Sequence, residues 1–168
     1  MTDYNGDLVG TVLASGAGPN PKGVSSARKG GSDKVFIRDT LELVTAFAQN
    51  DRILLGMVAA DAVLDPILSV IWFDDLGGAG LTMDVGGAGS SAGPENALVG
   101  GQDVTTAAGS CSALKSVNIS DYWKPLWQLY GLSANPGGML PVYAKIKGAD
   151  PGTGTVTWQL VGQRLLAG

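Results

Sequence analysis

The sequence contains no histidine and a single cysteine, Cys111, among its 168 residues. Without histidine it lacks the commonest general base, the commonest metal ligand and every Ser–His or Cys–His nucleophile pair. One cysteine excludes an internal disulfide bond, and we expect Cys111 to be a small buried residue rather than a nucleophile. These absences favour a protein that is not an enzyme and is made in a reducing compartment.

Charged residues are also scarce, at 15% of the chain compared with about 25% in soluble proteins generally. The net charge of −4 argues against nucleic acid as a partner of the folded body. No apolar run reaches the roughly 18–20 residues that a membrane-spanning helix needs, and the first six residues show no signal-peptide pattern. We therefore expect neither a nucleic-acid partner nor a membrane partner.

Glycine and apolar residues are abundant instead. The chain has 26 glycines, roughly twice the average share, and 45% of its residues are apolar. Its length suits one domain with a full core. This composition is typical of a turn-rich β protein whose surface is partly covered by partners.

Alternating apolar and polar residues predict β-strands along most of the chain from residue 34 onward. The expected strands are 34–47, 52–58, 66–73, 81–85, 142–147 and 155–160. Glycine-rich turns at 74–80 and 148–154 predict that the strands on either side of each turn form a β-hairpin. The near-continuous apolar run at 66–73 predicts a central strand that is buried on both faces.

One short helix is predicted at 121–131, where apolar side chains recur at helical spacing. They are Trp123, Leu126, Trp127 and Tyr130. The spacing predicts that both tryptophans are core residues rather than stacking platforms for sugars or bases. Together the helix and strands predict an antiparallel β-sandwich. Its expected core comprises Phe36, Leu43, Ile53, Ile67, Val70, Trp72, Leu81, Met83, Trp123, Trp127, Val142, Ile146, Trp158 and Leu160.

Residues 1–33 differ from the rest because they are rich in glycine, serine and proline, and only Leu8–Leu13 could form a short strand. From Pro19 to Arg38 there are five basic residues and one acidic residue, a net charge of +4. This pattern predicts an extended arm at 1–33 that orders on a partner, followed by a β-sandwich domain at 34–168. A tail without a role is the alternative. The residues expected to make the arm's contacts are Leu8, Val9, Val12, Leu13, Lys22, Arg28, Lys29 and Lys34.

The sequence holds no constellation typical of catalysis or of cofactor binding. Asp74 and Asp75 are expected to form a turn, because adjacent strand residues point to opposite faces and cannot act as a catalytic pair. The glycine-rich stretch 86–91 lacks the Gly-Lys-Ser/Thr of a phosphate-binding loop. We therefore predict no catalytic residue, no cofactor and no metal ion.

Several blocks of the sequence resemble the head decoration, or cement, proteins of tailed bacteriophages. These blocks are Asp39–Leu43 with Gln49–Gly56, Ile67–Gly78 with Leu81–Gly86, and Leu126–Gly138 with the strands Val142–Lys147 and Gly154–Val161. The similarity covers roughly Val35 to Leu166, and it consists of turns and core positions. It implies a β-sandwich of jelly-roll form and a structural virion protein without catalysis.

The resemblance also implies a location and partners. The protein would be made in the host cytoplasm, bind the capsid exterior and stabilise it by bridging neighbouring major capsid protein subunits. Copies are expected to associate as a homotrimer, although closed symmetry alone favours a dimer. A carbohydrate-binding β-sandwich module is the first alternative function, and another virion component, such as a head-fibre base or a tail protein, is the second. A sugar-binding module would show exposed aromatic residues, so the core-like spacing of the tryptophans favours the decoration protein.

Overall fold

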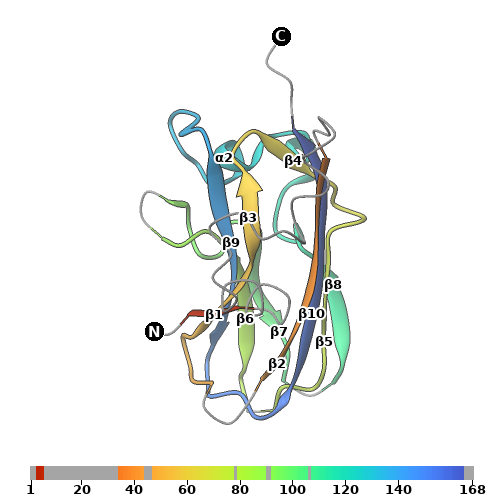
Figure 1. Cartoon of the computed structure of the whole chain (residues 1–168). Coiled ribbons are helices and arrows are strands. Elements are labelled where there is room, and N and C mark those ends of the chain that lie inside the picture. The colour runs from red at the N-terminus through yellow and green to blue at the C-terminus, as the bar shows by residue number, and fades with distance from the viewer. Residues whose placement is uncertain are drawn as a thin grey trace, which may run out of the picture.

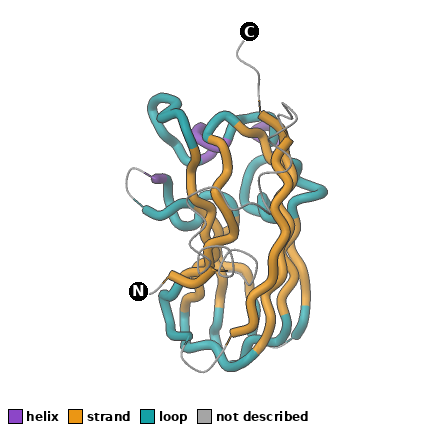
Figure 2. Tube along the Cα trace, viewed as in Figure 1, coloured by secondary structure: helices purple, strands orange, loops and turns teal. Residues whose placement is uncertain are grey.

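The computed structural model of the chain describes residues 3–5, 34–43, 47–77, 79–89, 92–105 and 107–164. Two β-sheets lie face to face with their strands running lengthwise, and short helical segments close one end (Figures 1 and 2). The strands are β1 (Asp3–Asn5), β2 (Lys34–Leu43), β3 (Arg52–Ala59), β4 (Ala62–Leu64), β5 (Val70–Phe73), β6 (Thr82–Gly86), β7 (Val99–Asp103), β8 (Gly109–Ser112), β9 (Met139–Lys147) and β10 (Gly154–Arg164). The fold is therefore a mainly antiparallel β-sandwich, as the sequence predicts.

Eight of these strands pair as a nested set. β2 pairs with β10, β3 with β9, β5 with β8, and β6 with β7, each pair antiparallel. Two further pairs, β9–β6 and β10–β5, join them into sheet A (β3-β9-β6-β7) and sheet B (β2-β10-β5-β8). A hairpin-like ribbon rolled up in this way over two sheets is a jelly roll. β1 adds a parallel strand to the edge of sheet A, and β4 pairs with β10.

Both predicted hairpins are wrong. β5 lies in sheet B while β6 lies in sheet A, and β9 lies in sheet A while β10 lies in sheet B. The glycine-rich turns therefore cross from one sheet to the other instead of reversing the chain within one sheet. Two stacked sheets lie about 10 Å apart, a distance that these long turns span easily.

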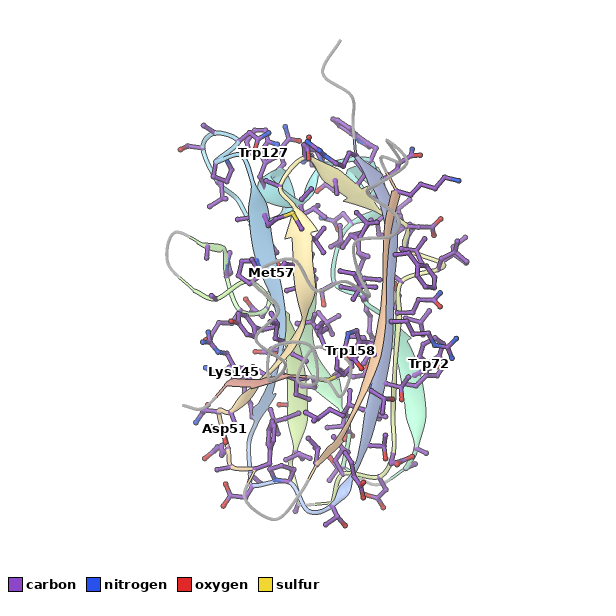
Figure 3. The ribbon with its side chains drawn as sticks, viewed as in Figure 1. Asp51, Met57, Trp72, Trp127, Lys145 and Trp158 are labelled. Atoms are coloured by element: carbon purple, nitrogen blue, oxygen red, sulfur yellow. The ribbon has the colours of Figure 1, made fainter. Side chains whose placement is uncertain are left out.

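Trp158 joins the two sheets at the centre of the core. Its side chain is fully buried between them (Figure 3), and its indole nitrogen Nε1 donates a hydrogen bond of 2.6 Å to the carbonyl oxygen of Leu55. That carbonyl lies in a β-bulge, because the register of β3 against β9 shifts between Leu54 and Gly56. Gly56 lacks the Cβ atom that would lie 2.6 Å from Ile37 of the opposite sheet. The bulge thus supplies an acceptor for the buried indole and lets the sheets approach.

Eight of the fourteen predicted core residues are buried: Leu43, Ile53, Leu81, Met83, Val142, Ile146, Trp158 and Leu160. Val70 and Trp127 are half-buried. The prediction is wrong for four, because Phe36, Ile67, Trp72 and Trp123 are exposed. Residues 66–73 are not one doubly buried strand: 66–68 form a turn, and β5 then alternates between an exposed and a buried face.

The predicted helix is shorter than its periodicity suggests. A single 3₁₀ turn spans Ile119–Asp121, turns follow, and the α-helix α2 covers only Leu126–Leu129 after Pro125 at its N-cap. Proline has no backbone donor and disfavours a helical conformation in the residue before it, so the helix begins after Pro125. Trp123 therefore lies outside the helix, and its side chain is 65% exposed.

Candidate interaction surfaces

The outer face of sheet A is charged, and its charges are paired. Lys145 of β9 lies opposite both Arg52 of β3 and Asp84 of β6. The Lys145 ammonium contacts Glu95 at 2.7 Å, and the guanidinium of Arg52 lies 4.4 Å from the centre of the Tyr143 ring. These contacts connect three strands with the loop that follows β6.

Lys147 and Asp84 form a second ion pair on this face. Their nitrogen and oxygen lie 2.9 Å apart, and the hydrogen bond and negative charge of Asp84 raise the pKa of Lys147. Asp84 is buried, and its other oxygen accepts a hydrogen bond of 2.7 Å from the backbone N–H of Gly101 in β7. The carboxylate therefore fixes the edge strand β7 to β6 and β9.

The loop between β6 and β7 covers part of this face. Gly87 donates a backbone hydrogen bond to Pro94. Gly93, at φ +89°, lies so close to Tyr130 that an added Cβ would fall 2.3 Å from the ring. Tyr130 is buried, which raises its pKa, and its hydroxyl donates to the carbonyl oxygen of Pro141 at 2.9 Å. The loop is thus packed against the segment that follows α2.

The outer face of sheet B has a different composition. The register places Thr40, Thr157, Trp72 and Ser110 in one row across all four strands, and the Thr40 and Thr157 hydroxyls contact each other. The row on one side of it contains Arg38, Gln159, Val70 and Ser112. The row on its other side begins with Glu42 and Thr155.

The second strand of this sheet, β10, has no charged residue at its outward positions. These positions are Thr155, Thr157, Gln159, Val161 and Gln163.

Exposed apolar side chains gather on and beside this face. Phe36 of β2 is 55% exposed and lies opposite Val161, and Trp72 of β5 is 39% exposed. Figure 3 shows Trp72 directed away from the core, on the opposite side of its sheet from Trp158. Ile67 and Leu68, 81% and 49% exposed, lie in the turn between β4 and β5, beside β10.

The turn that carries Ile67 and Leu68 is held by one carboxylate. Oδ1 of Asp65 accepts hydrogen bonds from the backbone N–H groups of Ile67 at 2.8 Å and Leu68 at 2.9 Å. Ser69, at the end of the turn, exchanges hydrogen bonds with the backbone of Val161 at 3.0 and 3.1 Å. The two apolar side chains are therefore presented by an ordered turn.

The charges of the sheet B face lie on its edge strand, β2, at Lys34, Arg38 and Glu42. Arg38 and Glu42 are both exposed, and neither takes part in an ion pair within the described part of the chain. Among the predicted arm contacts, the structure describes only Lys34, exposed in β2 opposite Gln163. Leu8, Val9, Val12, Leu13, Lys22, Arg28 and Lys29 lie outside the described residues.

A second group of exposed apolar residues lies between β8 and α2. Ile119 and Trp123 are 82% and 65% exposed. The prediction that both helix tryptophans face the core is therefore wrong for Trp123, and Trp127 is only half-buried. The spacing argument against sugar binding fails for the same reason, because a loop tryptophan is available for stacking.

Three side chains that the sequence offers for chemistry, Asp74, Asp75 and Cys111, have structural roles in the described residues. Asp74 and Asp75 lie in the turn after β5 and accept backbone hydrogen bonds from Thr155 and Gly77, at 3.0 and 2.9 Å. Cys111 is buried, and burial raises its pKa, so its thiolate is disfavoured. Within the described ranges, no group of three or more acidic or cysteine side chains could hold a metal ion, and no helix is long and apolar enough to cross a membrane.

The sequence matches no described protein family and no curated protein. Its structure is similar to a chain in the structure of the capsid of Ralstonia phage GP4, with a TM-score of 0.51 and 20% identity. The alignment covers 80% of this chain and 86% of that chain. A chain in the cyanophage Pam1 capsid asymmetric unit aligns over the same shares with a TM-score of 0.49 and 16% identity. The similarity to the Ralstonia phage GP4 chain shows a shared fold.

Proposed function

We propose that this protein is a structural component of a bacteriophage virion. The observation that carries the proposal is the jelly-roll fold, whose strand order extends over the whole described sandwich and which resembles a chain in a phage capsid structure over 86% of that chain. Jelly rolls are common in viral capsids, although they also occur in lectins and cupins. The paired, backbone-bound carboxylates are those of a structural protein rather than of an enzyme.

More specifically, we propose that the protein decorates the capsid. The protein binds the outer surface of the capsid and bridges neighbouring major capsid protein subunits, as the sequence resemblance implies. The basic stretch from Pro19 to Arg38, with its net charge of +4, favours an arm that docks on an acidic capsid surface. Charge steers such docking, while Leu8, Val9, Val12 and Leu13 supply the apolar contact, for example as an added strand.

Deletion of residues 2–33 tests this role. The truncated chain should fold with a cooperative unfolding transition but no longer co-sediment with shells assembled from the major capsid protein of the same virus. Replacing Lys22, Arg28, Lys29 and Lys34 by glutamine should weaken attachment less, and mainly at low salt, because exposed charge pairs contribute only ~0–1 kcal/mol each. Full-length protein that does not co-sediment with shells would contradict the decoration role itself. Unchanged binding of the truncated chain would contradict only the arm.

Carbohydrate binding is a second candidate, and the exposure of Trp123 favours it. An indole that is 65% exposed in a loop can stack against a sugar ring. A glycan array should then show binding that Trp123→Ala abolishes and Trp72→Ala leaves intact. An array without binding would leave the virion role as the sole proposal.

The number of copies is a further part of the proposal. The resemblance implies a homotrimer, which sedimentation equilibrium would reveal as a mass of three chains of 17.1 kDa. A monomer both in solution and on shells would contradict any oligomer.

A further inference from the structure

The exposed apolar side chains of sheet B gather around Arg38. Phe36 lies one row before Arg38 on the outer face, and Trp72 lies one row after it. Gln159, beside Arg38 in its row, donates a hydrogen bond of 3.0 Å to the carbonyl oxygen of Leu68, so the turn between β4 and β5 lies at the same level (Figure 1). The centres of protein–protein interfaces are enriched in aromatic residues and arginine. This group of side chains therefore has the composition of a protein-binding surface.

The charges of this face are distributed unequally along it. Lys34 and Arg38 lie at the end where the chain enters β2, whereas Glu42 lies beyond the row of Trp72. The apolar group thus has two basic residues at one end and a single acidic residue at the other. On sheet A, by contrast, both lysines of β9 are paired with carboxylates of the same chain. The basic end of the sheet B face therefore suits an acidic partner.

The basic end of this face is also the place where the N-terminal arm joins the folded body. The stretch Pro19–Arg38 carries a net charge of +4, and its last two basic residues, Lys34 and Arg38, lie on β2. They are four residues apart, which is about 13 Å along a strand. An arm that docks on an acidic capsid surface is covalently continuous with β2, so it holds this end of sheet B close to the same surface.

We infer that the outer face of sheet B is the surface of the folded body that docks on the capsid. The inference rests on the proposed function and specifies which face of the body the capsid protein covers. Acidic groups of the capsid meet Lys34 and Arg38, and an apolar patch beside them covers Phe36, Trp72 and the turn at 66–68. Charge directs the approach, while the apolar contacts hold the body in place.

Hydroxyl-radical oxidation tests the covered face in the unmodified protein. The full-length chain is oxidised free in solution and bound to shells assembled from the major capsid protein of the same virus. Trp72 and Phe36 should react in the free protein and lose most of that reactivity on shells. The controls are Trp123 and Met57, 65% and 44% exposed and outside this face, which should react equally in both states. Equal reactivity of Trp72 in both states would overturn the inference, and so would its protection in the free protein, because another copy would then cover the face.

Substitutions on the face test its contacts one at a time. Trp72→Ala should weaken co-sedimentation with shells at least about tenfold, whereas Trp123→Ala, the matched exposed tryptophan, should leave it unchanged. Arg38→Glu should also weaken attachment, most strongly at low salt. Its matched control is Glu42→Gln, a change of an exposed charge on the same strand and face, which should not weaken attachment.

Each variant is first checked for the wild-type urea transition and, by sedimentation equilibrium without shells, for the wild-type mass. A lower mass for Trp72→Ala would assign the face to a contact between copies and overturn the inference. Unchanged attachment of both Trp72→Ala and Arg38→Glu would overturn it as well, while leaving the proposed function intact. Full-length wild-type protein that does not co-sediment with shells would contradict the proposed function, and the inference would fall with it.

Discussion

The two outer faces of the sandwich use charge in opposite ways. On sheet A, Lys145 and Lys147 are each paired with a carboxylate, and a packed loop covers part of the face. On sheet B the outward charges lie on the edge strand, and the exposed side chains on and beside the face include Trp72, Phe36 and Ile67. A face whose polar groups are satisfied internally stabilises the monomer, whereas a face with exposed apolar surface suits a partner.

The largest loss of stability is expected from a substitution in the hydrophobic core, which lies between the two sheets. Trp158→Ala removes a fully buried indole, and we expect a loss of ~3–5 kcal/mol in the free energy of unfolding, measured by urea denaturation. Trp158→Phe retains most of the ring but leaves the Leu55 carbonyl without its donor, which should cost ~1–3 kcal/mol. A loss below ~1 kcal/mol for Trp158→Ala would contradict the placement of this ring.

The cover of sheet A offers a matched pair of glycines. Gly93 and Gly89 have almost the same φ, +89° and +88°, but only Gly93 lies against Tyr130, while nothing lies within 4 Å of the Cβ position of Gly89. Gly93→Ala should therefore cost ~2–4 kcal/mol, from backbone strain and the clash together. Gly89→Ala should cost only the strain, ~1 kcal/mol. Equal losses for the two variants would mean that the loop does not pack on Tyr130.

The ion pairs of sheet A should matter more than exposed ones. Glu95→Ala leaves the largely buried ammonium of Lys145 without this partner, and we expect a loss of ~1–2 kcal/mol, reduced from the fully buried case because Glu95 is partly exposed. The control is Asp121→Ala, which breaks the more exposed pair with Lys124 and should cost ~0–0.5 kcal/mol. If the control is the more destabilising of the two, sheet A has no special electrostatic role.

The smallest expected effect is a pH dependence of sheet A. The pKa of Lys147 is raised in the folded state, so its pairing with Asp84 contributes stability that is fully present below the ordinary value of 10.5. That contribution is lost as the pH rises through the raised folded-state pKa. Unfolding midpoints of the wild type and Lys147→Met should therefore differ near neutral pH and converge at alkaline pH. The effect is small because the lysine is largely exposed.

The fold class could be predicted from the sequence, but the strand partners could not. Alternation at 142–147 and 155–160 identifies two strands because side chains of a strand alternate between its faces. It contains no information on which strand lies beside which, and the hairpin rule selected the nearest neighbour. The nested pairing instead arises because the strands must form two sheets whose apolar faces cover each other. That requirement involves the whole sequence and cannot be read from a single turn.

The interaction surfaces were missed because local patterns were extended too far. Trp72 looked buried since it belongs to the apolar run 66–73, but Asp65 ends the preceding strand by forming a turn. Trp123 fitted a helical period that Pro125 interrupts. Both signals were present in the sequence, as an Asp-Pro turn and as a proline within the predicted helix.

The nested pairing also determines the order in which the chain can fold. β6 and β7 are close in sequence, whereas the paired Thr40 and Thr157 of β2 and β10 are 117 residues apart. Loop closure costs more entropy for longer loops, and each inner pair that forms shortens the loop that the next pair must close. We therefore expect strand pairing to begin with β6 and β7 in the middle of the sequence and to end with β2 and β10. Conservative substitutions in β6 should slow refolding, whereas those in β2 should mainly speed unfolding, which stopped-flow kinetics would show.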